Sequence, residues 1–325
     1  MTESTSAGAP PRAAQVICTL AEQHYFYGVA GLVNSLVSAG FEGVIVVGFR
    51  GEHPHWLEGF ARDPALDSYA ITPSVQLRLI EVAGPWHLNN CKPHFIADLL
   101  FKKYPEADLV YYFDTDIVIK QAWSSFVRWA NSGVVLVLDP ADSYMSPHHV
   151  YRRSWRDLAA KQNPACREFT GYVNGGCVGI SRSYAHFASV WSGLMEELER
   201  EGADMHKMKN ATGKLEYARM DQDVLNATIM ATDVPISLLG AEAMGMFPYV
   251  GEVMPHAMWH KKPWKRNYIL DALRGLPPTR AHRAYWEFVG GPIRPFSESA
   301  LLRKRAEFTI GHLISLLHSR SSRDL

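Results

Sequence analysis

The sequence has few cysteines and no excess of charge of either sign. Its 325 residues include four cysteines, Cys18, Cys91, Cys166 and Cys177, without a C-x-x-C pair. This wide spacing argues against a disulfide framework and favours buried thiols over metal ligands, in a reducing compartment. Lys and Arg number 33, the same as Asp and Glu. The overall charge therefore indicates neither nucleic acid nor an anionic membrane as the principal partner.

Long apolar runs are also absent from the sequence. No stretch of 18 apolar residues occurs, and the first fourteen residues lack the basic start and apolar segment of a signal peptide. We therefore expect residues 1–14 to form a disordered tail and the protein to be cytoplasmic. With 47% hydrophobic residues, the remainder can bury a large core as one elaborated domain or two fused ones.

The periodicity of the remaining chain predicts an α/β fold. Short apolar runs alternate with amphipathic segments, as expected for a sheet whose parallel strands are joined by helices. Strands are predicted over 15–20, 43–48, 77–82, 109–113, 134–138 and 172–180. Helices are predicted over 29–37, 91–103, 184–200 and 221–231, with a polar surface loop over 201–218.

The C-terminal segment changes character and predicts a basic, amphipathic helix. Three cations, Arg303, Lys304 and Arg305, precede a run of apolar residues at Phe308, Ile310, Leu313, Ile314, Leu316 and Leu317. Such a helix can pack on the core, form a homodimer, or make a peripheral membrane contact. We predict a main domain over 15–275 and a C-terminal helical extension over 276–325.

A pair of acids follows the predicted strand 109–113. Asp114, Thr115 and Asp116 stand at its carboxyl end, where α/β sheets bind ligands, and alternate residues there point to one side. Both carboxylates can reach one divalent cation, which prefers oxygen ligands and neutralises a departing diphosphate. The alternative is a turn with two solvated acids; the apolar sequence on both sides favours the metal site.

Three further motifs carry polar chemistry. Asp221 and Gln222 begin a predicted helix, where the carboxylate can cap backbone N–H groups or the pair can bind a polyhydroxylated ligand. His256 can complete a carboxylate metal site, and Lys262 can hold a phosphate, unless the surrounding tryptophans only pin a loop. The glycines in 171–176 allow close approach of a ligand to Asn174, or form a bulge.

These four motifs, in this order, resemble glycosyltransferase family 8, which contains bacterial lipopolysaccharide galactosyl- and glucosyltransferases and glycogenin. The similarity extends in pieces from about residue 16 to 264, and D-Q-D-x-x-N with H-x₅-K-P-W is more specific than D-x-D alone. The resemblance implies a GT-A fold with a Rossmann-like mixed sheet flanked by helices. It also implies a UDP-sugar donor, Mn²⁺ or Mg²⁺, and transfer with retention.

The resemblance also assigns roles to individual residues. Asp114, Asp116 and His256 match the metal ligands, while Asp221 and Gln222 match the pair beside the donor sugar. The matched donor-binding positions are Thr19, Leu20, Tyr25, Lys92, Asp114, Thr115, Asp139, Asn174, Gly175 and Lys262. The resemblance implies that Tyr25 stacks on uracil. The match of Thr19, Leu20 and Tyr25 to the family's first nucleotide-binding loop requires a gap of one residue in the alignment.

Two departures from the family pattern concern the donor site. Trp259 replaces the glycine that lets the backbone approach the phosphate. Asp98 falls near the register of the basic residue expected beside the sugar, and Lys92 is the nearest cation. The base and the sugar of the donor are therefore less constrained than the type of reaction.

The sequence leaves several functions open for comparison. A sugar nucleotidyltransferase normally carries a glycine-rich basic loop after the first strand, which residues 21–27 do not form. The sequence gives no support for a metal-dependent hydrolase, because the zinc-binding motif H-E-x-x-H does not occur in it. A non-catalytic sugar-nucleotide-binding protein would not need a metal site, so the presence of Asp114, Asp116 and His256 argues against this function. The acceptor is an unidentified sugar, glycolipid or small natural product, and residues 144–155 are a candidate wall of its site.

Overall fold

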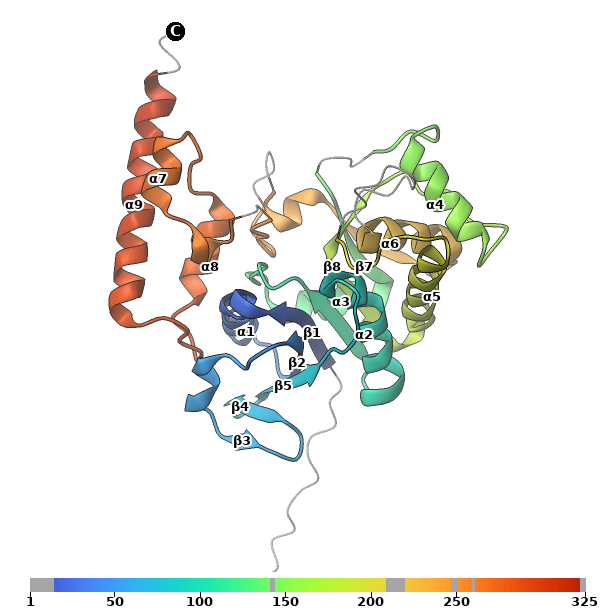
Figure 1. Cartoon of the computed structure of the whole chain (residues 1–325), viewed down its shortest axis with the longest axis horizontal. Helices are drawn as coiled ribbons and strands as arrows, with labels where there is room; N and C mark the ends of the chain where they lie inside the picture. The colour runs from blue at the N-terminus through green and yellow to red at the C-terminus, as the bar shows by residue number, and fades with distance from the viewer. Residues whose placement is uncertain (1–14, 141–143, 209–219, 247–250, 259–260, 322–325) are drawn as a thin grey trace, which may run out of the picture.

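A mixed β-sheet forms the centre of the protein. The computed structural model describes residues 15–140, 144–208, 220–246, 251–258 and 261–321. In this part of the chain, nine strands lie in the order β3-β4-β5-β2-β1-β6-β8-β7-β9 (Figure 1). The strands are β1 (Gln15–Glu22), β2 (Gly43–Arg50), β3 (Arg62–Asp63), β4 (Ser68–Thr72), β5 (Val75–Glu81), β6 (Leu109–Phe113), β7 (Val134–Leu138), β8 (Val173–Ser181) and β9 (Ile236–Leu239).

The pairing of the strands is parallel on one side of the sheet and mixed on the other. β5, β2, β1 and β6 pair in parallel, as buried strands joined by helices do. β8 runs antiparallel to both β6 and β7, so it begins at the edge where β6 ends. Because β8 runs in the opposite direction, its first residues lie beside the last residues of β1 and β6, at the same edge of the sheet.

The predicted α/β class and all six predicted strands are confirmed, with ends shifted by at most two residues. β3, β4 and β9 were not predicted from the sequence. β3 is a two-residue exposed strand, and β9 is mostly half-buried. Neither shows a run of buried positions, so periodicity gave no signal for them.

Helices cover both faces of the sheet. They are α1 (Phe26–Ser38), α2 (Lys92–Asp98), α3 (Trp123–Ser132), α4 (Val150–Ala160), α5 (His186–Arg200), α6 (Met220–Ala231), α7 (Tyr268–Leu273), α8 (Arg280–Phe288) and α9 (Glu298–Ser321). The five predicted helices correspond to α1, α2, α5, α6 and α9, whereas α3, α4, α7 and α8 were not predicted from the sequence. The predicted helix 91–103 is divided, because α2 continues as a π-helical turn over Leu99–Lys103. Of the predicted loop 201–218, residues 209–218 lie outside the described part.

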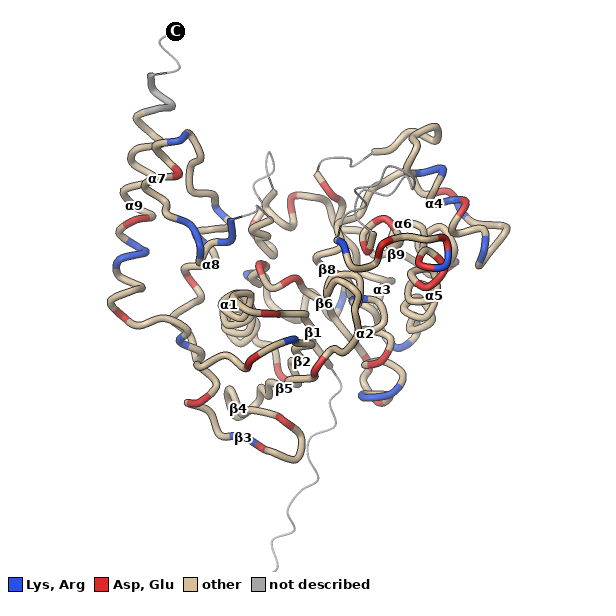
Figure 2. The backbone as a smooth tube through the Cα atoms, viewed as in Figure 1, with Lys and Arg blue, Asp and Glu red and all other residues tan. Residues whose placement is uncertain are grey.

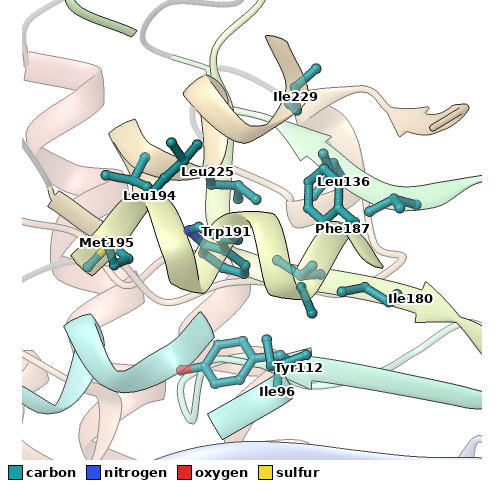
Figure 3. Close-up of a cluster of buried hydrophobic side chains, with 14 of the residues drawn as sticks. Ile96, Tyr112, Leu136, Ile180, Phe187, Trp191, Leu194, Met195, Leu225 and Ile229 are labelled. Carbon is teal, nitrogen blue, oxygen red and sulfur yellow. The ribbon is translucent and has the colours of Figure 1, made fainter. Parts of the chain in front are cut away.

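Alternation along the strands sends side chains into two separate cores. On β6, Val110 and Tyr112 enter one core, whereas Tyr111 and Phe113 enter the other. The first core lies under α2, α5 and α6, where Trp191 of α5 lies among other buried apolar side chains, including Leu225 of α6 (Figure 3). Because both faces are covered, every residue of β6 is buried. Cys18, Cys91 and Cys177 are buried free thiols, and Cys166 is half-buried.

The helices α7, α8 and α9 build a third core at one side of the molecule (Figure 1). Tyr268 of α7 and Trp286 of α8 are buried there, and the ring of Phe308 on α9 lies 5.1 Å from that of Tyr268. α7 begins before residue 276, the predicted boundary of the helical extension, and packs against α9. None of the helices described is both long and apolar enough to cross a membrane.

A buried polar network lies within this third core. Arg266 Nε donates to Asp271 Oδ2 at 2.9 Å, and its Nη1 lies 3.3 Å from both ring nitrogens of His282. Burial, reinforced by the charge of Arg266, lowers the pKa of His282 to about 3. His282 also completes the N-terminal capping box of α8 with Thr279.

We expect His282 to make the protein less stable in acid. Its pKa is about 6.5 in the unfolded chain and lower in the folded protein, so the unfolded state binds the extra proton. Its contribution is complete above the unfolded pKa and is lost as pH falls from about 6.5 towards 3, by up to roughly 1.4 kcal/mol per pH unit. Urea unfolding of the wild type and of His282→Gln between these limits should give curves of different slope against pH. The same change at exposed His55 should leave the slope unchanged, and equal slopes for all three proteins would refute the role of His282.

Candidate functional site

A cavity of about 390 Å³ opens where β1 and β6 end and β8 begins. Ligand sites of open α/β sheets form at this edge. Twelve of the predicted site residues line it: Leu20, Tyr25, Lys92, Asp114, Thr115, Asp116, Asn174, Gly175, Asp221, Gln222, His256 and Lys262. The cavity therefore collects residues from all four sequence motifs.

Asp114, Asp116 and His256 come together as a possible metal site. A β-bridge pairs Ile117 with His256, and the N–H of Ala257 donates to the carbonyl of Asp116, which ties the two segments together. His256 Nε2 lies 3.3 Å from Asp116 Oδ1 and 3.8 Å from Asp114 Oδ2. One ligand atom from each residue lies within 4.8 Å of the others. Two carboxylates and an imidazole in this arrangement fit a divalent cation of the Mn²⁺ or Mg²⁺ type.

Lys262 places a positive charge beside the metal ligands. Its Nζ lies 2.6 Å from Asp116 Oδ2, from a position 146 residues further along the chain. Burial would raise the pKa of the Asp116 carboxyl, but Lys262 and His256 outweigh that effect and hold its pKa below the usual range. Burial likewise would lower the pKa of Lys262, and Asp116 raises it instead. Both groups are therefore charged at neutral pH.

Lys92 is a buried cation between two carboxylates. It is 1% exposed, and its Nζ lies 2.8 Å from Asp221 Oδ2, 3.5 Å from Asp114 Oδ1 and 2.8 Å from the carbonyl oxygen of Gly175. Burial alone would lower the pKa of Lys92, but Asp114 and Asp221 together raise it. Lys92 thus links Asp114, which follows β6, with Asp221 of α6.

Tyr112 also supports Asp114, although the sequence analysis did not name it. Its hydroxyl donates to Asp114 Oδ1 at 2.8 Å, and Lys92 Nζ lies 4.6 Å from the centre of its ring. Asp114 Oδ1 is thereby engaged, which leaves Oδ2 facing His256. The signal was present in the sequence, because residues two apart on a strand point to the same side.

Asp139, Asn174 and Gln222 form a hydrogen-bond network. Asn174 Nδ2 and Gln222 Nε2 lie 3.0 and 3.3 Å from Asp139 Oδ2, and Gly175 N donates to Gln222 Oε1 at 3.1 Å. Asp139 is buried and, in the described part of the chain, does not line the cavity. Asp139 Oδ2 therefore holds the amides of Asn174 and Gln222 from behind, and its role as a donor-binding residue stays a prediction.

Glycine at position 176 permits the close approach of β8 to the metal ligands. A Cβ atom there would lie 2.8 Å from His256 Cε1 and 3.0 Å from Asp114 Oδ2. Any side chain would displace one of the two, so the strand can pass here only as glycine. The predicted bulge is present as well, because the pairing of β8 with β7 shifts register between Val135 and Val137, opposite this stretch.

Tyr25 lines the cavity near the end of β1 and contacts two further aromatic residues. The rings of His24 and Tyr25 stack at 4.5 Å, and Trp264 Nε1 donates to His24 Nδ1 at 3.0 Å. Leu20 lines the cavity but Thr19 does not, since adjacent residues of a strand point to opposite sides. The Thr19 side chain is buried in the interior, so the structure does not bring it to the cavity with the other predicted donor-binding residues.

The two departures from the family pattern have different outcomes. Asp98 lies outside the cavity and pairs with Lys102 and Lys103, whereas Lys92 reaches the cavity from the first turn of α2. Trp259 lies outside the described residues.

Several residues that line the cavity were missed by the sequence analysis. His87 and Asn89 belong to a loop that the carbonyl of Met205 holds through the N–H of His87, at 2.8 Å. No local pattern distinguishes them, since their position depends on a contact with a distant loop. The missed lining residues are Glu22, His87, Leu88, Asn89, Tyr112, Gly176, Met208 and Met258.

Comparison with known proteins places the fold. No protein-family model and no curated protein sequence matches the chain. The apo structure of the bifunctional glycosyltransferase WbbM is 13% identical with a TM-score of 0.55, covering 91% of this chain, which spans 52% of that protein's chain. The galactosyltransferase LgtC, in complex with donor and acceptor sugar analogues, is 15% identical with a TM-score of 0.53, covering 90% of this chain and 99% of its own. The chain is thus a distant structural relative of these glycosyltransferases and shares their GT-A fold.

Proposed function

We propose that the protein is a metal-dependent glycosyltransferase that moves a hexose-type sugar from a nucleoside diphosphate to an acceptor hydroxyl, with retention. The observation that carries the proposal is the convergence of Asp114, Asp116, His256 and Lys262 on one cavity. Two acids, an imidazole and a lysine suit a metal-bound diphosphate better than a neutral ligand. The family resemblance favours UDP as the nucleotide, and it favours a sugar, glycolipid or small natural product as the acceptor.

The cavity divides into a diphosphate side and a sugar side. A divalent cation on Asp114, Asp116 and His256 would supply neutralisation of the leaving diphosphate. Lys262 binds an oxygen of that diphosphate as a point charge, since its Nζ already lies among the metal ligands. On the other side, Asp221 and Gln222 orient the sugar, and the charge of Asp221 stabilises positive charge developing at the anomeric carbon.

The engagement of Asp221 by Lys92 favours attack on the same face as the leaving group. A carboxylate bound to a buried ammonium at 2.8 Å is a weak nucleophile. The acceptor oxygen then bonds to the anomeric carbon as the bond from that carbon to the diphosphate breaks. The acceptor proton passes to the departing diphosphate oxygen, so the donor's anomeric configuration is retained.

Slow donor hydrolysis tests the proposal without a known acceptor. Incubated with Mn²⁺ and a panel of UDP- and GDP-sugars, the protein should release free sugar and nucleoside diphosphate from at least one donor. Chelation with EDTA should stop the release, and Mg²⁺ or Mn²⁺ should restore it. Intact NDP-sugars, together with release of pyrophosphate when a nucleoside triphosphate and a sugar 1-phosphate are supplied instead, would identify a sugar nucleotidyltransferase. Binding of donors without turnover, even with candidate acceptors present, would identify a non-catalytic sugar-nucleotide-binding protein and overturn the proposal.

A further inference from the structure

The outward face of α9 carries an exposed apolar stripe. Leu302, Leu313 and Leu316 are 66%, 56% and 46% exposed. With Ala306 and Thr309 between them, these residues recur at four- and three-residue spacing and so share one side of the helix. Ile310 and Leu317, at 45% and 65%, widen the stripe. A contiguous apolar face of this kind marks an interaction surface, unlike single exposed leucines.

The opposite side of α9 is already occupied by the rest of the protein. Lys304 Nζ donates to the carbonyl of Arg266 at 2.8 Å, and Phe308 packs on Tyr268. Gly311 lies so close that a Cβ atom would be 2.5 Å from the carbonyl oxygen of Tyr268. Each of these residues stands two positions from a member of the stripe, which is about 200° around a helix. The stripe therefore points away from the molecule.

Unpaired cations line the flank of the stripe that faces α8. Arg283, Arg305 and His312 form no ion pair with any residue in the described ranges. Arg283 and His312 line two hollows of about 500 Å³ each beside α8 and α9, both of which Phe308 also lines, and Arg305 lines one of them. The acids there, Glu252 and Glu287, both pair with Lys120; Glu252 also lies 3.9 Å from Arg280, and the nearby charge of Arg283 helps to lower its pKa.

The other flank of the stripe is also basic. Arg303 is exposed, and the one acid between Leu302 and Leu317, Glu307, turns inwards to pair with Lys304. Figure 2 shows the basic positions of α8 and α9 at the side of the molecule away from α4 and α5. The neutral overall charge of the chain thus conceals a local basic surface around the stripe.

We propose that this surface docks on an anionic phospholipid membrane. The leucines would enter the boundary between headgroups and acyl chains, while Arg283 and Arg305 bind lipid phosphates in the hollows beside them. Pairing of two α9 stripes would instead bring Arg303 and Arg305 of each copy close to those of the other, while Glu307, the one acid in this stretch of α9, already pairs with Lys304, which disfavours a second copy as the occupant. The inference is independent of the proposed transferase activity.

Vesicle co-sedimentation of the full chain tests this proposal. The protein should bind phosphatidylcholine vesicles containing about a third phosphatidylglycerol, bind pure phosphatidylcholine far more weakly, and be released by about 0.5 M NaCl. Changing Arg283→Gln and Arg305→Gln together should weaken partitioning roughly 25-fold, about fivefold per cation. Leu313→Asp should weaken it at least about tenfold, because the stripe then carries a charge into the membrane boundary.

Matched variants elsewhere on the surface provide the controls. Leu66, 47% exposed in the segment between β3 and β4, and the exposed Arg153 of α4 lie outside the proposed surface. Leu66→Asp and Arg153→Gln should bind vesicles as the wild type does, and circular dichroism should confirm that all variants are folded. Equal binding to neutral and anionic vesicles, or no binding to either, would overturn the proposal. A dimer that dissociates with Leu313→Asp, without vesicle binding, would show that a second copy covers the stripe instead.

Discussion

Replacing Asp116 by Asn should reduce metal-stimulated donor turnover by about 10³-fold and weaken Mn²⁺ binding by at least about 100-fold. Asp116 is the acid that contacts both His256 and Lys262, so its charge would hold the proposed metal site and the proposed diphosphate site together. The amide has the same shape and keeps neutral hydrogen bonds, so the fold should persist. Titration calorimetry with Mn²⁺ and donor hydrolysis measure the two effects separately.

Asp98→Asn is the matched control for this prediction. Asp98 is also an acid paired with lysines, but it lies on α2 outside the cavity. Its amide variant should bind Mn²⁺ and hydrolyse the donor as the wild type does. Unchanged metal affinity in Asp116→Asn would contradict the assigned metal site. Lost affinity with undiminished turnover would retain the site but contradict its role in catalysis.

Lys92→Met should lower both turnover and stability. The lysine is 1% exposed, so its removal leaves the buried carboxylate of Asp221 without its cation. An uncompensated buried charge costs about 3–5 kcal/mol of unfolding free energy. Donor turnover should fall about 100-fold, because Asp221 and Asp114 lose the group that positions both. Urea unfolding and donor hydrolysis measure these changes.

A second substitution separates the two effects of Lys92. Adding Asp221→Asn to Lys92→Met removes the orphaned charge and should restore most of the lost stability, while turnover stays low. Lys161→Met serves as a control, since Lys161 is half-exposed and pairs with Glu197 and Glu201 at the surface. That change should alter the unfolding free energy by less than about 1 kcal/mol. A double variant no more stable than Lys92→Met alone would disprove the charge-pair explanation.

The predictions from sequence succeeded where a signal was local. The β6 strand could be identified because five consecutive apolar residues end at an acid, and the place of its two acids at the ligand-binding edge of the sheet followed from strand geometry. The capping explanation of Asp221 was equally local and incomplete, because its carboxylate turns to Lys92 of a different helix. The sequence could not distinguish these alternatives without knowing which helices lie side by side.

The sequence alone determined the alternation of strands and helices and the place of the two acids directly after β6. Only the tertiary structure decided that His256 and Lys262 reach those acids, that Lys92 and not Asp98 enters the cavity, and that Thr19 and Asp139 stay behind it. The physical reason is range. Periodicity and caps are set by neighbours along the chain, whereas the meeting of side chains 146 positions apart depends on the packing of the whole sheet and its helices.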